Sequence, residues 1–361
     1  MPPERTRLTV ILPTYKRPEF LRKALESVMA QDFADFTIRV YDNASGDGTA
    51  AVVEEFARIR GNVGYHCHEK NIGARANFLF GLLQVDTPFF CFLSDDDLML
   101  PGFLSTAMEA FDRHPSALFS ALQSLNIDND DRVWAITGDG WPTGYYAGKP
   151  GIDAFCAHGH LIWTGIVFAK SAMPDFAGLM ERYEVVSDLA AQLSLVLRGP
   201  FAVTARPGAA FRSHPSSYSQ MSFKQIADET AEMIDLVVTR SAIEPGMKAG
   251  IAGTVKAPLY NMVFGMWPRL VQGSDNPGPV LEYFAWLRGW RAKSIGGFDR
   301  KLFVLTSLVR ITLIAPFIFG PLKRALGRRN ARIQARSAAD PKLGPLQNLL
   351  TAKAAASADA L

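Results

Sequence analysis

Four short strand-like runs alternate with segments of helical periodicity in the first third of the chain. The runs cover residues 8–13, 36–41, 63–68 and 88–93, and the last of them is apolar throughout. The segments between them repeat apolar side chains at helical spacing and cover residues 18–30, 49–59 and 73–83. Strands that alternate with helices of this length form parallel βαβ units. The sequence therefore predicts an α/β fold with a Rossmann-like, mostly parallel central sheet flanked by helices.

Polar residues follow each of the four predicted strands. They are Thr14, Asp42, Asn71 and Asp95. The carboxyl ends of parallel strands lie along one edge of the sheet, and open α/β sheets bind ligands at that edge. We therefore expect these four side chains to lie close together in a binding site.

Three consecutive acids, Asp95, Asp96 and Asp97, follow the fourth run after one residue, Ser94. Adjacent like charges resist burial unless water or a cation neutralises them. Two interpretations are open at this point. The acids form either a solvated turn that caps the helix after Pro101, or a hard-metal site that holds a phosphate ligand. The other polar strand ends favour the metal site.

Further strands and helices are predicted beyond residue 100. Apolar runs predict strands at 117–125, 133–136, 161–168 and 201–204. Helical periodicity predicts helices at 102–114 and 187–197. The glycine-rich aromatic stretch 138–151 is interpreted as a loop, which either faces a substrate or lies plainly on the surface.

The chain is expected to divide into four parts. Residues 1–220 form the α/β domain, and residues 221–300 form a helical appendage interrupted by prolines. A basic amphipathic segment covers 301–336, and a disordered, alanine-rich tail covers 337–361.

The most apolar stretch, residues 302–320, is predicted to lie on a membrane surface. Arg310 at its centre costs about 2.5–3.5 kcal/mol on insertion scales, and Pro316 interrupts it, so a spanning helix is disfavoured. Residues 301–336 contain no acid and carry eight basic residues, which favour an anionic lipid surface. A core helix followed by a solvated basic tail is the alternative. The basic residues are Lys301, Arg310, Lys323, Arg324, Arg328, Arg329, Arg332 and Arg336.

Composition limits the class of protein. The net charge of +3 over 361 residues is too small to indicate a nucleic-acid partner. Three cysteines without metal-ligand spacing indicate reduced, buried thiols, and the polar stretch 1–7 lacks the apolar core of a secretion signal. We expect a cytoplasmic protein, peripherally associated with the inner face of the cell membrane.

Four sequence motifs together resemble one enzyme family. They are Ile-Leu-Pro-Thr-Tyr-Lys-Arg at 11–17, Asp-Asn-Ala-Ser-Gly-Asp-Gly-Thr at 42–49, Asn-Ile-Gly-Ala-Arg-Ala-Asn at 71–77 and Leu-Ser-Asp-Asp-Asp-Leu at 93–98. In their order and spacing, residues 5–220 resemble the family 2 glycosyltransferases of the GT-A fold. The resemblance implies a nucleotide-diphospho-sugar donor, a divalent cation (Mg²⁺ or Mn²⁺) and inversion at the anomeric carbon.

The resemblance also implies a set of donor contacts. Asp42 would accept a hydrogen bond from the nucleobase, which favours uracil and hence a UDP-sugar, although Asp42 could instead cap its own turn. The remaining implied donor contacts are Thr14, Tyr15, Arg17, Asn71, Arg75 and Asp95.

Metal, base and acceptor residues are implied in the same way. Asp96 would bind the metal, Asp97 would support it as a ligand or an orienting acid, and His214 would complete the metal shell. The family often has an acid at the position of Ser94, so the identity of the two working acids stays open. Asp188 would be the general base and Trp163 an acceptor contact; a helix-capping charge and a core tryptophan are the alternatives.

The function expected from these residues is glycosyl transfer in the synthesis of a cell-surface glycan or its lipid-linked precursor. Two alternatives remain. A nucleotidyltransferase would carry a glycine-rich phosphate loop after its first strand, which residues 13–17 do not form. Against a non-catalytic scaffold with a degenerate sugar-nucleotide site stands the retention of five acids, Asp42, Asp95, Asp96, Asp97 and Asp188.

Overall fold

The computed structural model describes two compact units. The residues described are 6–212, 223–233, 236–237, 245–246, 248, 271, 275–294, 299–314, 316–338 and 343–350. Residues 6–212 and 343–350 belong to the first unit, and the described residues between them belong to the second.

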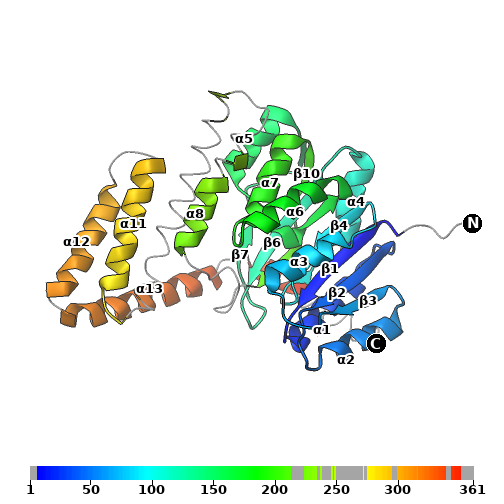
Figure 1. Cartoon of the computed structure of the whole chain (residues 1–361), viewed down its shortest axis with the longest axis horizontal. Helices are drawn as coiled ribbons and strands as arrows, with labels where there is room; N and C mark the ends of the chain where they lie inside the picture. Colours follow the sequence, from blue (N-terminus) through cyan, green and yellow to red (C-terminus); the bar gives the residue numbers. More distant parts are fainter. Residues whose placement is uncertain are drawn as a thin grey trace, which may run out of the picture. The chain divides into compact units, whose positions relative to one another are not determined.

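A ten-stranded sheet forms the centre of the first unit, with its main path in the order β3-β2-β1-β4-β9-β6-β10-β5 (Figure 1). Its first four strands are parallel. They are β1 (Leu8–Thr14), β2 (Phe36–Asp42), β3 (Val63–Cys67) and β4 (Phe89–Phe92). The predicted parallel βαβ arrangement is confirmed for this half of the sheet.

Helices cover both faces of β1, which explains why all seven of its residues are buried. Val10 and Leu12 belong to a core shared with α1 (Pro18–Met29) and α2 (Thr49–Ile59). On the opposite face α3 (Ala74–Leu83) approaches so closely that a Cβ at Gly81 would lie 2.7 Å from Ile11 Cγ2. A strand covered on both sides reads as a continuous apolar run.

Antiparallel pairing appears in the second half of the sheet. The strands here are β5 (Leu98–Met99), β6 (Phe119–Ile127), β7 (Val133–Thr137), β8 (Gly144–Tyr146), β9 (Ile166–Ala169) and β10 (Phe201–Arg212). β9 runs antiparallel to β4 and β6, whereas β10 is parallel to β6. The helices are α4 (Phe103–Arg113), α5 (Gly148–His158), α6 (Met173–Arg182) and α7 (Ser187–Arg198).

Three sequence predictions are corrected in this half. Residues 138–151 contain β8 and the start of α5, because residues 144–146 pair with the beginning of β10. The strand expected over 161–168 begins as a 3₁₀ turn, η1 (Trp163–Gly165). β10 extends well past residue 204, because register shifts around Pro207 let the strand continue beside β6.

The described residues of the second unit are helical. They form α8 (Phe223–Met233), α11 (Gly278–Ser294), α12 (Arg300–Ile314), the 3₁₀ turn η5 (Pro316–Ile318) and α13 (Phe319–Ala338). α12 packs on α11 and buries Leu302, Thr306, Val309 and Thr312 at helical spacing. Within the described residues, none of the helices has the length and apolar character needed to cross a bilayer.

Residues 343–350 return to the first unit. Residues 344–350 are helical, and Leu343 and Leu350 join an apolar cluster with Leu98, Leu100, Leu125, Ile127, Val133 and Ala210. The expected disordered tail over 337–361 is therefore not observed for these residues, because their leucines are covered by the sheet. The expectation of buried cysteine thiols is also corrected in part. Cys91 is buried, but Cys67 is exposed.

The close approach at Gly81 predicts a stability effect. Gly81→Ala should lower the urea unfolding midpoint and cost about 1–3 kcal/mol, because the added methyl group overpacks the contact between α3 and β1. Gly178, an exposed glycine of α6 with open space around it, is the matched control. Gly178→Ala should stabilise by about 0.4–1 kcal/mol, and equal effects at both positions would contradict the packing argument.

Candidate active site

The polar strand ends converge at one edge of the sheet, as the sequence predicted. Thr14 Oγ1 donates to Asp95 Oδ2 over 2.8 Å, which joins the ends of β1 and β4. Asn43, directly after β2, donates its backbone N–H to the Thr14 carbonyl (3.0 Å) and its Nδ2 to Asn71 Oδ1 (3.0 Å). One hydrogen-bonded row therefore connects the ends of β1, β2 and β4 with the loop before α3.

Asp95 is buried against β1. Besides the Thr14 hydroxyl it accepts a hydrogen bond from the Tyr15 N–H (3.3 Å), and Arg17 Nη1 lies 3.3 Å from its Oδ1. Burial, and then the charge of Asp96, raise the pKa of Asp95 to about 7. The carboxylate is thus held in place by groups that also lower the cost of its burial.

Asp97 has no exposed surface (0%). Its Oδ2 accepts from Thr164 Oγ1 (2.6 Å), and its Oδ1 accepts from the backbone N–H of Arg212 (2.8 Å). Burial, followed by the charge of Asp96, raises the pKa of Asp97 well above its ordinary value. Since both oxygens bind the scaffold, Asp97 fits the orienting role better than the role of a metal ligand.

Asp96 lies between these two acids and points toward Arg17. Its side chain is 12% exposed, and its Oδ2 lies 2.8 Å from Arg17 Nη1. The guanidinium therefore spans Asp95 and Asp96, so that a cation already faces the pair. Carboxylate oxygens are ligands for Mg²⁺ and Mn²⁺, which need only one or two of them when phosphate oxygens complete the shell.

No larger metal cluster is found in the described part of the chain. None of its regions groups three or more His, Cys, Asp or Glu side chains in a way that would hold a metal. His214, the predicted third ligand, lies outside the described residues. A metal held by Asp96 would therefore need further ligands from outside the described residues, such as phosphate oxygens.

Both carboxylate oxygens of Asp42 accept hydrogen bonds from neighbouring residues. Its Oδ1 accepts from the Ser45 N–H (2.9 Å) and Ser45 Oγ (2.6 Å), which caps the turn after β2. Its Oδ2 accepts from the Tyr65 hydroxyl (2.6 Å), and burial together with this contact raises the pKa of Tyr65. The turn-capping role is thus present, and a nucleobase that reaches Oδ2 competes with Tyr65.

Two other predicted donor residues are exposed around this row. The Tyr15 ring is exposed, and its neighbours Asn71 and Lys16 lower the pKa of its hydroxyl. Arg75, at the start of α3, is exposed and donates to the Glu181 carbonyl of α6 over 3.1 Å.

Asp188 lies in the first turn of α7 and is half-buried. One turn further, buried Gln192 brackets the backbone of Leu161, accepting from its N–H (2.9 Å) and donating to its carbonyl (2.5 Å). Leu161 leads into η1, whose Thr164 binds Asp97. This chain of contacts attaches the helix that carries Asp188 to the segment that supports the acidic motif.

Trp163 is part of an aromatic stack. Its ring lies 5.0 Å from that of Phe78 and 4.9 Å from that of Phe92, measured between centroids. It is half-buried, so the stack satisfies the core-tryptophan alternative while part of the ring stays accessible.

The sequence did not predict the contacts of three residues. Thr164 and Arg212 bind Asp97, and Tyr65 binds Asp42. The signals were weak. A hydroxyl between Trp163 and Gly165, and a charge that ends the apolar run 209–211, were the only local signs that these side chains face polar partners.

The Thr164 contact predicts a stability difference between two variants. Thr164→Val keeps the shape but leaves buried Asp97 Oδ2 without its hydroxyl donor, which costs about 1–3 kcal/mol. Thr164→Ser keeps the hydroxyl and should unfold at a higher urea concentration than Thr164→Val. A valine variant as stable as the serine variant would show that the hydroxyl does not support Asp97.

Comparisons with known proteins agree with this geometry. Residues 9–174 match Glycosyl transferase family 2. The Campylobacter jejuni GalNAc(5)-diNAcBac-PP-undecaprenol beta-1,3-glucosyltransferase is 38% identical over 104 residues, which cover 28% of this chain and 34% of the relative. The chain thus spans about a third of that relative's length.

Two solved structures share the fold. S. aureus TarS 1-349 in complex with UDP-GlcNAc has a TM-score of 0.60 at 15% identity, covering 90% of this chain and 92% of TarS 1-349. The mannosyltransferase PcManGT from Pyrobaculum calidifontis, in complex with GDP-Man and Mn²⁺, has a TM-score of 0.52 at 15% identity, covering 95% and 89%. The chain therefore carries a glycosyl transferase family 2 domain of the GT-A fold over residues 9–174.

Proposed function

We propose that this protein transfers a sugar from a nucleoside-diphosphate donor, preferably a UDP-sugar, to an acceptor hydroxyl with inversion of configuration. The observation that carries the proposal is the pair Asp95 and Asp96, which share a cationic partner next to the hydrogen-bonded ends of β1 and β2. All of these residues lie inside the segment that matches the family.

In this proposal Asp96 is the residue that would hold a divalent cation, together with the donor diphosphate. When bound, Mg²⁺ or Mn²⁺ neutralises the charge that grows on the leaving diphosphate. Asp95, fixed by Thr14, contacts the donor ribose, and Asp97 orients the motif through Thr164. Arg17, which contacts both acids, would offer its guanidinium to the negatively charged diphosphate of the donor.

Asp188 is proposed as the general base. It accepts the proton of the acceptor hydroxyl while that oxygen attacks the anomeric carbon from the face opposite the diphosphate. The new carbon–oxygen bond forms as the bond to the diphosphate oxygen breaks, so a single displacement inverts the centre. Trp163, at the accessible edge of its aromatic stack, contacts the acceptor sugar.

The acceptor is proposed to be a cell-surface glycan or its lipid-linked precursor. The Campylobacter relative is named for an undecaprenol-linked acceptor, and the second unit offers a surface suited to a membrane. On α12 a face opposite the buried one exposes Phe303, Val304, Leu308 and Ile311, and Arg310 is exposed beside it. Apolar side chains next to basic ones fit an anionic lipid surface on the inner face of the cell membrane.

A pair of substitutions tests the catalytic proposal. Asp188→Asn should reduce sugar transfer by about 10²- to 10⁴-fold and leave binding of UDP with Mn²⁺ unchanged, because it removes only the proton acceptor. Asp96→Asn should weaken binding of UDP in the presence of Mn²⁺ and leave binding without the metal nearly unchanged. Transfer is measured as release of UDP from UDP-sugars, and binding by calorimetry.

Two outcomes would contradict the proposal. Transfer by Asp188→Asn at the wild-type rate would exclude Asp188 as the base. Failure of the wild-type protein to release a nucleoside diphosphate from any common donor, although it binds one, would favour a sugar-nucleotide scaffold.

The membrane surface on α12 gives a separate prediction. The double substitution Leu308→Asp with Ile311→Asp should reduce co-sedimentation with phosphatidylglycerol vesicles by at least about tenfold, because each side chain contributes about 1.5 kcal/mol or more when buried in lipid. The matched control, Ile59→Asp with Leu83→Asp, changes two exposed apolar residues of the first unit. Equal loss in both proteins, or equal binding to phosphatidylcholine vesicles, would contradict the proposed surface.

A further inference from the structure

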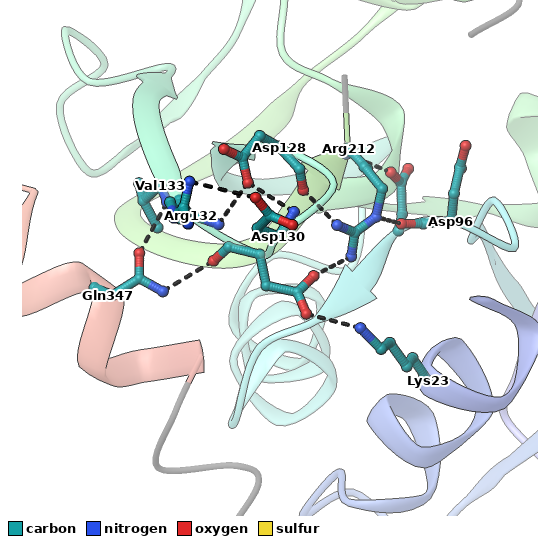
Figure 2. Close-up of polar contacts among 10 residues, drawn as sticks. Lys23, Asp96, Asp128, Asp130, Arg132, Val133, Arg212 and Gln347 are labelled. Atoms are coloured by element: carbon teal, nitrogen blue, oxygen red, sulfur yellow. Dashed lines mark hydrogen bonds and ion pairs between the residues drawn. The ribbon is translucent and has the colours of Figure 1, made fainter. Parts of the chain in front are cut away.

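Arg212, the last residue of β10, is a buried arginine whose side chain is 0% exposed. Its Nε donates to the Asp96 carbonyl (2.8 Å), its Nη1 donates to the Asp128 carbonyl (2.5 Å), and its Nη2 pairs with the Asp131 carboxylate (Figure 2). The guanidinium also lies 5.0 Å from the centroid of the Phe20 ring. One side chain thus joins the acidic motif, the turn between β6 and β7, and α1.

A buried guanidinium is tolerated only when its charge is paired and its N–H groups are satisfied. Asp131 supplies the carboxylate, and its backbone has φ +59°, in the left-handed region that an aspartate adopts at some cost. The turn is held partly by its own hydrogen bonds, in which the N–H groups of Asp130 and Arg132 donate to Asp128 Oδ1 over 2.9 Å each. Lys23 of α1 adds a contact from outside, since its Nζ lies 2.9 Å from Asp131 Oδ2.

Another contact from outside the turn comes from Gln347, which lies 216 residues after Asp131 in the sequence. Its Nε2 donates to the Asp131 carbonyl (2.9 Å), and its Oε1 accepts from the Val133 N–H (2.9 Å). Figure 2 shows the turn between Gln347 on one side and Arg212 on the other. The apolar contacts of Leu343 and Leu350 hold the short C-terminal helix in this position.

At its other end, Arg212 contacts both acids that follow Asp95. Its side chain binds the Asp96 carbonyl, and its backbone N–H binds Asp97 Oδ1 over 2.8 Å. A continuous series of hydrogen bonds therefore runs from Gln347 through Asp131 and Arg212 to the acidic motif. Each step is within hydrogen-bonding distance, and the Arg212 side chain itself is buried, whereas that of Asp131 is 33% exposed.

We propose that Arg212 is a positioning residue for Asp96 and Asp97, and that residues 343–350 complete the active site by bracing the turn that holds Arg212. Partners of metal-binding side chains fix their orientation, and their loss typically reduces metal affinity or activity by about 10- to 100-fold. The expected loss of metal affinity or activity rests on the proposed glycosyltransferase function. The support of Arg212 by residues 343–350 does not depend on that function.

The test compares Gln347→Ala with Leu349→Ala in the full-length chain. Leu349 is an exposed position of the same short helix and serves as the matched control. In Gln347→Ala, hydrogen–deuterium exchange should become faster for the Val133 amide and also for the Arg212 amide, which donates to Asp97. Calorimetric titration of Mn²⁺ in the presence of UDP should show weaker metal binding for Gln347→Ala and wild-type binding for Leu349→Ala.

A second variant keeps the positive charge at position 212 but replaces the planar guanidinium with an ammonium group. Arg212→Lys cannot reach three partners at once, so metal affinity should fall by about 10- to 100-fold while the urea midpoint stays closer to wild type than in Arg212→Ala. A loss of metal affinity in proportion to the unfolded fraction alone would overturn the positioning role.

The outcomes separate this proposal from the proposed function. If Gln347→Ala changes exchange only near Val133 and leaves the Arg212 amide and Mn²⁺ affinity unchanged, the bracing proposal is wrong. If the wild-type protein binds no UDP, the proposed function fails, and the exchange of the Arg212 amide still decides whether residues 343–350 support the motif.

Discussion

Burial of the carboxylate of Asp97 is the constraint on which the candidate site depends. Three acids in a row repel one another, and this fold buries the first and the third of them. Asp97 is compensated by neutral donors, a hydroxyl and a backbone N–H, which come from segments 67 and 115 residues away. Those donors are in place only when η1 packs beside β4 and the end of β10 pairs with β5, so the acidic motif and the sheet order depend on each other.

The same constraint gives the three acids different surroundings. Asp95 binds β1, and Asp97 binds η1 and β10, so neither can move without breaking buried hydrogen bonds. Asp96 is oriented by its neighbours and directs its carboxylate to Arg17. Asp95 and Asp97 are thus fixed on either side of Asp96, which faces the guanidinium of Arg17. Such an arrangement suits a site in which charge develops during a reaction, because preorganised groups need little reorganisation.

Local pattern was sufficient to predict the first half of the fold and, in the second half, α4, β6, β7 and α7, but not β5 or β8. Residues 8–93 form consecutive βα units, so each strand and its polar end could be predicted from nearby residues. The two-residue strand β5 exists because it pairs with residues 209–210, and β8 exists because it pairs with the start of β10. Partners this distant leave no local pattern. The Thr164–Asp97 and Gln347–Asp131 contacts escaped prediction for the same reason, and the alanine-rich composition after residue 350 concealed the short leucine pattern before it.

The matched family segment does not contain all residues of the proposed site. Residues 9–174 contain the strand ends and the three acids, but Asp188, Arg212 and Gln347 lie beyond them. The chain leaves the described part of the first unit at Arg212 and returns to it at Leu343, and Arg212 and Gln347 bind the same residue, Asp131. The turn at Asp131 thus links the end of β10 to the helix over 344–350 within the first unit. Since Arg212 also binds Asp96 and Asp97, the geometry of the acidic motif depends on segments that the family comparison does not cover.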